Sequence, residues 1–177
     1  EPLTESDILL RALRDFNIPK IVTQDEVVFF GLLGDLFPGL NPPRERDETL
    51  ESAVVKACAN RGMEPEDDFC LKCVQLEELL AIRHCVFVMG PPGSGRTECW
   101  KTLAEAAIIR GNKVKIRDLN PKAITPEELY GFINLATREW KDGVLSKVLR
   151  DQGQEPDIDN SKWLMLDGDL DANWIES

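Results

Sequence analysis

The order of apolar and polar residues divides the chain into a helical first half and a second half in which strands alternate with helices. In the first half, apolar residues recur every three or four positions, the period of a helix with one buried face. Proline and glycine mark the ends of these runs. The pattern predicts an extended stretch over 18–24 and helices over 5–17, about 25–36, about 48–60 and about 65–83.

Shorter apolar runs in the second half predict strands. Residues 85–89 form an apolar run without helical punctuation, residues 113–118 alternate apolar and basic side chains, and residues 163–166 form a third short run. Such runs are typical of buried or half-buried strands. The segments between them predict helices over 96–110, 126–132 and about 142–151. We therefore expect an α/β fold, with a parallel sheet flanked by helices, preceded by an all-helical segment.

A turn rich in glycine and proline joins the run at 85–89 to the next helix. Glycine allows left-handed backbone angles and close approach to a polyphosphate, and the helix N-terminus adds partial positive charge. The turn matches the phosphate-binding pattern G-x-x-x-x-G-[K/R]-[S/T] at Gly90, Pro91, Pro92, Gly93, Ser94, Gly95, Arg96 and Thr97. We expect these residues to bind a nucleotide and the Thr97 hydroxyl to contact Mg²⁺. The alternative, a plain glycine-rich turn, is disfavoured by the match at all eight positions and by the flanking strand and helix.

Arg96 departs from this pattern, which has lysine at its position. Lysine is a compact ammonium that fits between phosphate groups, whereas arginine is planar, broad and always charged. Arg96 can still neutralise phosphate, with a different geometry. The sequence therefore predicts a nucleotide-binding loop with poor hydrolysis.

A carboxylate follows the last apolar run. Asp167 after four apolar residues fits the Walker B arrangement, in which the carboxylate holds Mg²⁺ directly or through water, although such an aspartate is often only a turn residue. A hydrolysing site normally continues with a glutamate that positions the attacking water. Gly168 stands there instead and cannot act as a base. We therefore expect a bound nucleotide with little hydrolysis, and we assign no catalytic residue.

Charge and composition narrow the function classes. The 177 residues carry a net charge of −11, which argues against general nucleic-acid binding. No apolar run approaches the roughly 20 residues that span a bilayer. The acidic start at 1–5 does not resemble a signal or transit peptide, and because it lacks methionine we expect an excerpt of a longer chain. We expect a cytoplasmic protein with no nucleic acid and no membrane as partners.

Five cysteines lie along the chain, an odd number that suits reduced thiols better than a disulfide framework. Cys70 and Cys73 have the C-x-x-C spacing of some zinc and redox sites. However, no second pair has a ligand spacing, and His84 is the only histidine. Because Cys73 falls at helical spacing with neighbouring apolar residues, we interpret both thiols as small core residues.

Several longer motifs resemble dynein heavy chains, and most of all axonemal outer-arm heavy chains. The likeness is detailed over 5–38 and 76–177 and looser over 39–75. The segments that carry it are 10–20, 34–38, 118–125, 128–131, 137–143, 163–169 and 174–176.

The resemblance implies a partial P-loop AAA+ module, the second of the motor ring. Residues 1–24 would be the C-terminal helix of the preceding module and a connector, and 25–177 the N-terminal part of the AAA+ domain, with helices over 25–83 and the P-loop core over 84–177. The family's sheet has the strand order 5-1-4-3-2. Strand 4 would separate the strands at 85–89 and 163–166, so we expect an incomplete sheet that does not fold alone.

The resemblance also implies an ATP-driven, minus-end-directed microtubule motor of the ciliary or flagellar axoneme. ATP or ADP with Mg²⁺ would bind at this module chiefly for structure or regulation. Implied partners are neighbouring AAA+ modules and the linker of the same heavy chain, with residues 120–145 nearest the linker, and microtubules and other dynein-arm subunits through the parent protein. Two alternatives stay open: a nucleotide-free structural spacer, which Arg96 favours, and a stand-alone P-loop NTPase or kinase.

Overall fold

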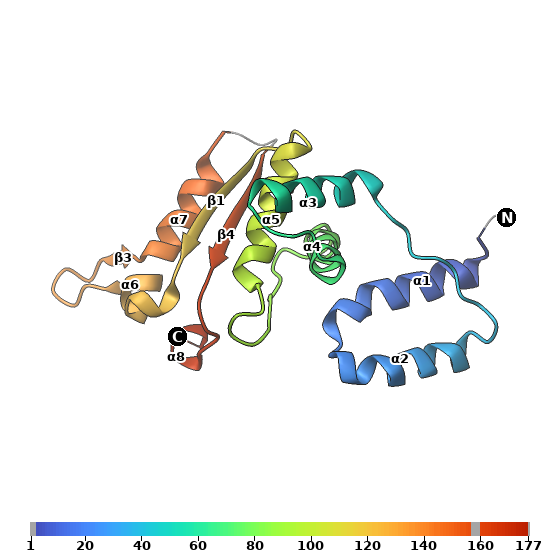
Figure 1. Ribbon diagram of the computed structural model, residues 1–177. Coiled ribbons are helices and arrows are strands. Elements are labelled where there is room, and N and C mark those ends of the chain that lie inside the picture. The colour runs from blue at the N-terminus through green and yellow to red at the C-terminus, as the bar shows by residue number, and fades with distance from the viewer. Residues whose placement is uncertain (1–2, 157–159, 177) are drawn as a thin grey trace. The chain divides into compact units, whose positions relative to one another are not determined.

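The computed structural model describes residues 3–156 and 160–176 and divides the chain into two compact units, Glu1–Ala106 and Ala107–Ser177 (Figure 1). Both helices and strands are present, which confirms the predicted α/β class. In the described part of the chain, no helix combines the length and apolar character that a membrane span requires. The domain boundary expected after residue 24 stays a prediction.

The first unit is helical, as the apolar periodicity predicted. Its elements are α1 (Glu5–Asn17), the 3₁₀ turn η1 (Ile18–Lys20), α2 (Thr23–Leu36), α3 (Glu48–Asn60), α4 (Asp67–Leu80) and the larger part of α5 (Arg96–Ile109). The extended stretch predicted over 18–24 is wrong. Pro19 stands in the first turn of η1, where its fixed φ angle fits, and α2 then begins at Thr23.

Side-chain caps explain where these helices begin. Thr4 accepts the Asp7 amide while the Asp7 carboxylate accepts the Thr4 amide, a reciprocal capping box at the start of α1. Asp47 accepts two amides at the start of α3, and Glu66 accepts the Phe69 amide at the start of α4. Each cap satisfies donors that the first helical turn leaves unpaired.

The core of the first unit lies among α3, α4 and α5. Small and medium side chains dominate it: Leu50, Ala53, Val54, Ala57, Cys58, Cys73, Val74, Leu76, Cys99, Trp100, Leu103, Ala104 and Ala106 are buried. Full burial of a side chain such as Leu103 contributes about 1.5–3 kcal/mol. In contrast, α2 buries only Leu33 among its described residues, and Val27 is 78 % exposed.

The strand predicted over residues 85–89 is wrong. No regular secondary structure is assigned there, and Phe87 and Met89 are 64 % and 74 % exposed. A strand forms only where a neighbour pairs with its backbone groups. The strand order 5-1-4-3-2 expected from the resemblance would separate this segment, as strand 1, from the strands predicted over 113–118 and 163–166.

The second unit contains a parallel pair of strands. Strands β1 (Val114–Leu119) and β4 (Ser161–Leu166) lie side by side, in a register that runs from Val114 opposite Ser161 to Leu119 opposite Leu166 (Figure 1). Both confirm the strands predicted near these positions. The helical elements of this unit are η2 (Pro121–Ala123), α6 (Pro126–Tyr130), α7 (Val144–Gln154) and α8 (Ala172–Ile175).

A small hairpin in the second unit escaped sequence prediction. Strand β2 (Gly131–Ile133) pairs antiparallel with β3 (Trp140–Asp142). Gly131 has φ +123°, and a Cβ there would collide with Trp140 and the Lys141 carbonyl. A three-residue strand is too short to show a clear alternation of apolar and polar residues. The glycine at position 131 was therefore the one sequence feature that could have indicated this hairpin.

Candidate nucleotide-binding site

Residues 90–97 form a tight turn that leads directly into α5. Gly93 and Gly95 have φ angles of +80° and +83°, in the left-handed region that glycine adopts readily. The Ser94 amide donates to the Pro91 carbonyl at 3.2 Å, and the Cys99 amide donates to the Gly95 carbonyl at 2.8 Å as α5 begins. The turn thus combines two left-handed glycines with a following helix N-terminus, and both features favour binding of an anion.

Two further glycine contacts define the loop. A Cβ on Gly90 would lie 2.6 Å from the Ser94 Oγ, so the loop folds back on its own start. A Cβ on Gly95 would lie 3.6 Å from the Phe69 ring, which is ordinary contact. A Cβ on Gly90 would require the Ser94 hydroxyl to rotate, whereas at Gly95 the φ angle itself favours glycine.

Arg96 occupies the first position of α5 and is half-buried. Its Cγ lies 3.7 Å from the position that a Cβ on Gly90 would take, so the stem of the side chain packs along the loop. Among residues 3–156 and 160–176, no carboxylate forms an ion pair with Arg96. The guanidinium can therefore neutralise an anion at this loop.

Contacts with the C-terminal end of α3 hold α5 in place. Glu98 forms an ion pair with Arg61, and Glu105 accepts a hydrogen bond from Asn60 at 3.3 Å. The buried face of α5, including Cys99 and Leu103, packs into the core of the first unit. One side of α5, the helix that follows the loop, is therefore held against the rest of the first unit.

Asp167 lies at the carboxyl end of β4. Its amide donates to the Leu119 carbonyl at 3.0 Å, which extends the pairing of β1 and β4 by one position, and its side chain is exposed. The predicted strand ending in a carboxylate is thus present. Because Asp167 belongs to the second unit and Thr97 to the first, their convergence on one Mg²⁺ stays a prediction.

Gly168 packs closely against the turn that follows β1. A Cβ there would lie 3.1 Å from the Asn120 Oδ1 and 3.2 Å from the Pro121 Cδ. The Asn120 Oδ1 is itself engaged, since it accepts the Lys122 amide at 3.0 Å. The position where a hydrolysing site has glutamate therefore lacks a base and also has little room for a side chain.

Lys122 neutralises two nearby carboxylates, a role that sequence reasoning missed. Its Nζ lies 3.3 Å from Asp171 and 3.4 Å from Asp169. These carboxylates raise the pKa of Lys122, Asp171 more than Asp169. The pKa of Asp171 is lowered, first by the Asn173 amide that it caps and then by Lys122. Lys122, Asp169 and Asp171 thus form an ion-pair cluster. In the sequence, this cluster was indicated only by a lysine soon after the end of a predicted strand.

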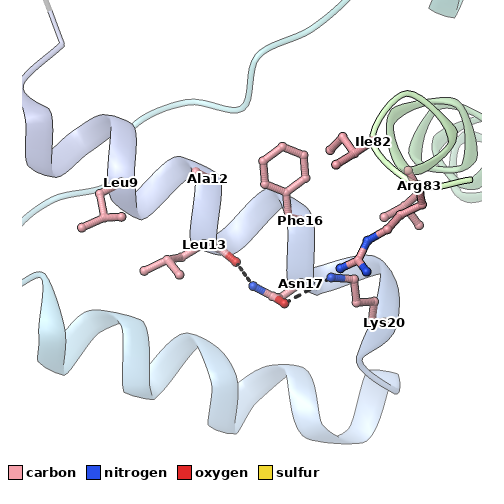
Figure 2. A pocket seen from close by; sticks show the side chains of 9 residues that line it. Leu9, Ala12, Leu13, Phe16, Asn17, Lys20, Ile82 and Arg83 are labelled. Atoms are coloured by element: carbon pink, nitrogen blue, oxygen red, sulfur yellow. Dashed lines mark hydrogen bonds between the residues drawn. The ribbon is translucent and has the colours of Figure 1, made fainter.

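An apolar cavity of about 520 Å³ lies elsewhere in the first unit (Figure 2). Leu9, Leu13 and Phe16 of α1 line it together with Leu79 and Ile82 at the end of α4, and Lys20 and Arg83 add positive charge at its edge. None of its lining residues belongs to the loop at 90–97. The cavity is therefore separate from the candidate nucleotide site.

Two family models match the chain in succession. Residues 1–97 match the hydrolytic ATP-binding site of the dynein motor region, and residues 85–177 match the AAA domain of the dynein-related subfamily. The chain belongs to the dynein heavy-chain family. The order of the two matches fits a segment at the boundary between two AAA modules, and AAA domains of this kind imply nucleotide binding.

Curated relatives agree with this assignment. The chain is 58 % identical over 187 residues to the dynein alpha chain of the flagellar outer arm of Chlamydomonas reinhardtii. It is 51 % identical over 173 residues both to a ciliary dynein beta chain of Tripneustes gratilla and to dynein axonemal heavy chain 9 of Homo sapiens. Each match covers 98 % of this chain but only 4 % of the relative. The predicted likeness to axonemal dynein heavy chains is confirmed.

Proposed function

We propose that the chain forms a nucleotide-binding ring module of an axonemal dynein heavy chain that hydrolyses little or no ATP at this site. The observation that carries the proposal is the loop at 90–97, in which Gly93 and Gly95 adopt positive φ angles immediately before the N-terminus of α5. Family membership favours this ring-module reading over a stand-alone NTPase or kinase.

The residues of the loop fit ATP or ADP with Mg²⁺. The backbone of residues 90–97 would hold the phosphates, and Arg96 would add positive charge without the narrow reach of lysine. The Thr97 hydroxyl and the Asp167 carboxylate would hold Mg²⁺, which neutralises phosphate charge when bound. The positive φ angles and the close fold of the loop at Gly90 support this fit.

Poor hydrolysis follows from the surroundings of Gly168. Attack of water on a phosphate needs a group that positions the water, and glycine offers none. The neighbouring carboxylates of Asp169 and Asp171 form ion pairs with Lys122. Lys122 therefore competes with a water molecule for their oxygens. A module of this kind binds nucleotide for structure or regulation.

The wider role comes from the relatives, whose names place them in the flagellar outer arm, in cilia and in the axoneme. By this likeness, the module belongs to an ATP-driven, minus-end-directed microtubule motor of the axoneme. Its direct partners would be the neighbouring AAA+ modules and the linker of the same heavy chain. Microtubules and other arm subunits would bind through the parent protein.

Photolabelling of the intact heavy chain with azido-ATP tests the proposal, because digestion assigns the label to particular peptides. We expect label on peptides from residues 3–176, reduced by Thr97→Ala but not by the control Thr137→Ala in the exposed loop between β2 and β3. Turnover is measured in parallel with the first module disabled. Absence of label would favour the nucleotide-free spacer, and brisk turnover at this site would overturn the claim of weak hydrolysis.

A further inference from the structure

Two cysteine thiols meet in the core of the first unit. The Sγ of Cys73 on α4 lies 3.7 Å from the Sγ of Cys99 on α5, and the Cys73 thiol donates toward Cys99. Cys73 is fully buried and Cys99 is 7 % exposed. All five cysteines are free thiols, and only Cys85 is exposed. In the described part of the chain, no three His, Cys, Asp or Glu side chains are placed to share a metal ion.

The surroundings of the two thiols shift their pKa values in opposite directions. The pKa of Cys99 is lowered below its ordinary value, chiefly by the hydrogen bond from Cys73 and further by the positive charge of Lys72, against the opposing effect of burial. The same bond and burial raise the pKa of Cys73. Because the thiolate is the reactive form, these shifts favour Cys99 as the attacking sulfur and Cys73 as the resolving one.

We propose that Cys73 and Cys99 form a reversible disulfide site that responds to peroxide. The Cys99 thiolate attacks one oxygen of hydrogen peroxide, which gives a sulfenic acid and releases hydroxide. The Cys73 sulfur then attacks the sulfenic sulfur, and the sulfenic oxygen leaves as water. The hydroxide from the first step becomes water by taking up the proton that Cys99 lost. Overall, two thiols lose two hydrogens and one peroxide is reduced to two waters.

Closing this bond would move the start of α5. A disulfide holds its sulfurs about 2.0 Å apart, so the pair must approach by about 1.7 Å. Cys99 stands two residues after Thr97, in the first turn of α5. Phe69, one helical turn before Cys73 on α4, lies against Gly95. The disulfide would therefore draw the first turn of α5 toward α4 and disturb the phosphate-binding loop.

Peptide mapping of the intact heavy chain tests the site. The chain is treated with hydrogen peroxide, its remaining free thiols are alkylated under denaturing conditions, and the peptides are analysed by mass spectrometry. We expect a peptide pair joined through Cys73 and Cys99 that dithiothreitol separates. The control Cys85→Ser should retain the cross-link, because Cys85 is exposed and outside the pair.

A second measurement keeps the test independent of folding defects. In Cys73→Ala, Cys99 loses its resolving partner and should accumulate as a sulfenic acid that dimedone traps. Recovery of Cys73 and Cys99 as alkylated thiols in the wild type, or a cross-link of Cys99 to Cys58 or Cys70 instead, would overturn the proposal.

The effect on the loop rests on the proposed nucleotide function. We expect oxidation to reduce azido-ATP labelling of residues 3–176 in the wild type but not in Cys73→Ala. A cross-link without any change in labelling would contradict the coupling to the loop and leave the disulfide site intact. Absence of labelling even in reduced protein would instead count against the proposed nucleotide binding.

Discussion

Gly93 offers a direct test of the phosphate-binding loop through the substitution Gly93→Ala. Its φ angle is +80°, and no atom lies within 4 Å of the position that a Cβ would take. A methyl group there meets open space, so the substitution changes backbone preference and not packing. An L-residue in the left-handed region costs about 1–2 kcal/mol.

This cost falls on the nucleotide-bound loop if binding requires the left-handed angle. A penalty of about 1–2 kcal/mol weakens affinity about 5- to 30-fold. The assay is azido-ATP labelling of the intact heavy chain, with the labelled peptides of this segment quantified over a range of nucleotide concentrations. Because the readout is specific to these peptides, other nucleotide sites in the heavy chain do not interfere.

Gly34→Ala is the matched control. Gly34 lies inside α2, also has no atom within 4 Å of its Cβ position, and does not have a positive φ angle. Alanine is preferred over glycine in a helix, so Gly34→Ala should leave the labelling midpoint unchanged. An unchanged midpoint in Gly93→Ala would refute the reasoning, since the bound loop would then not depend on this angle.

Three further predictions concern the residues around the site. Gly168→Glu should not raise ATP turnover in a heavy chain whose first module is disabled, because its Cβ already crowds the turn after β1; a clear gain would contradict this. Thr97→Ala should reduce the Mg²⁺ dependence of azido-ATP labelling, and an unaltered Mg²⁺ titration would remove Thr97 from the metal site. Acylation of Lys122 should be slower than that of exposed Lys141, because its raised pKa leaves less neutral amine, and Asp171→Asn should speed it. The ion pair behind that shift contributes stability below the usual lysine pKa of 10.5 and loses it as the pH rises through the raised value.

Local features of the sequence were sufficient for most helices and for the candidate loop. The predicted helix over 48–60 agrees with α3. Thr4 and Thr125 cap α1 and α6, and such caps depend only on residues within one turn. The phosphate-binding pattern likewise reflects backbone angles set by its own glycines. Lys122 was missed because its partners lie about fifty positions later, where no local pattern connects them.

The apolar character of residues 85–89 was not enough to decide whether they form a strand. The run is a strand only where another strand pairs with it, and β1 and β4 pair with each other instead. By itself, the amino-acid sequence determined the family, the approximate positions of most helices and the glycine-rich turn before α5, since these depend on neighbouring residues. Only the tertiary structure decided which strands pair, how closely Gly168 meets the turn after β1, and that Cys73 and Cys99 face each other, because each depends on contacts between distant parts of the chain.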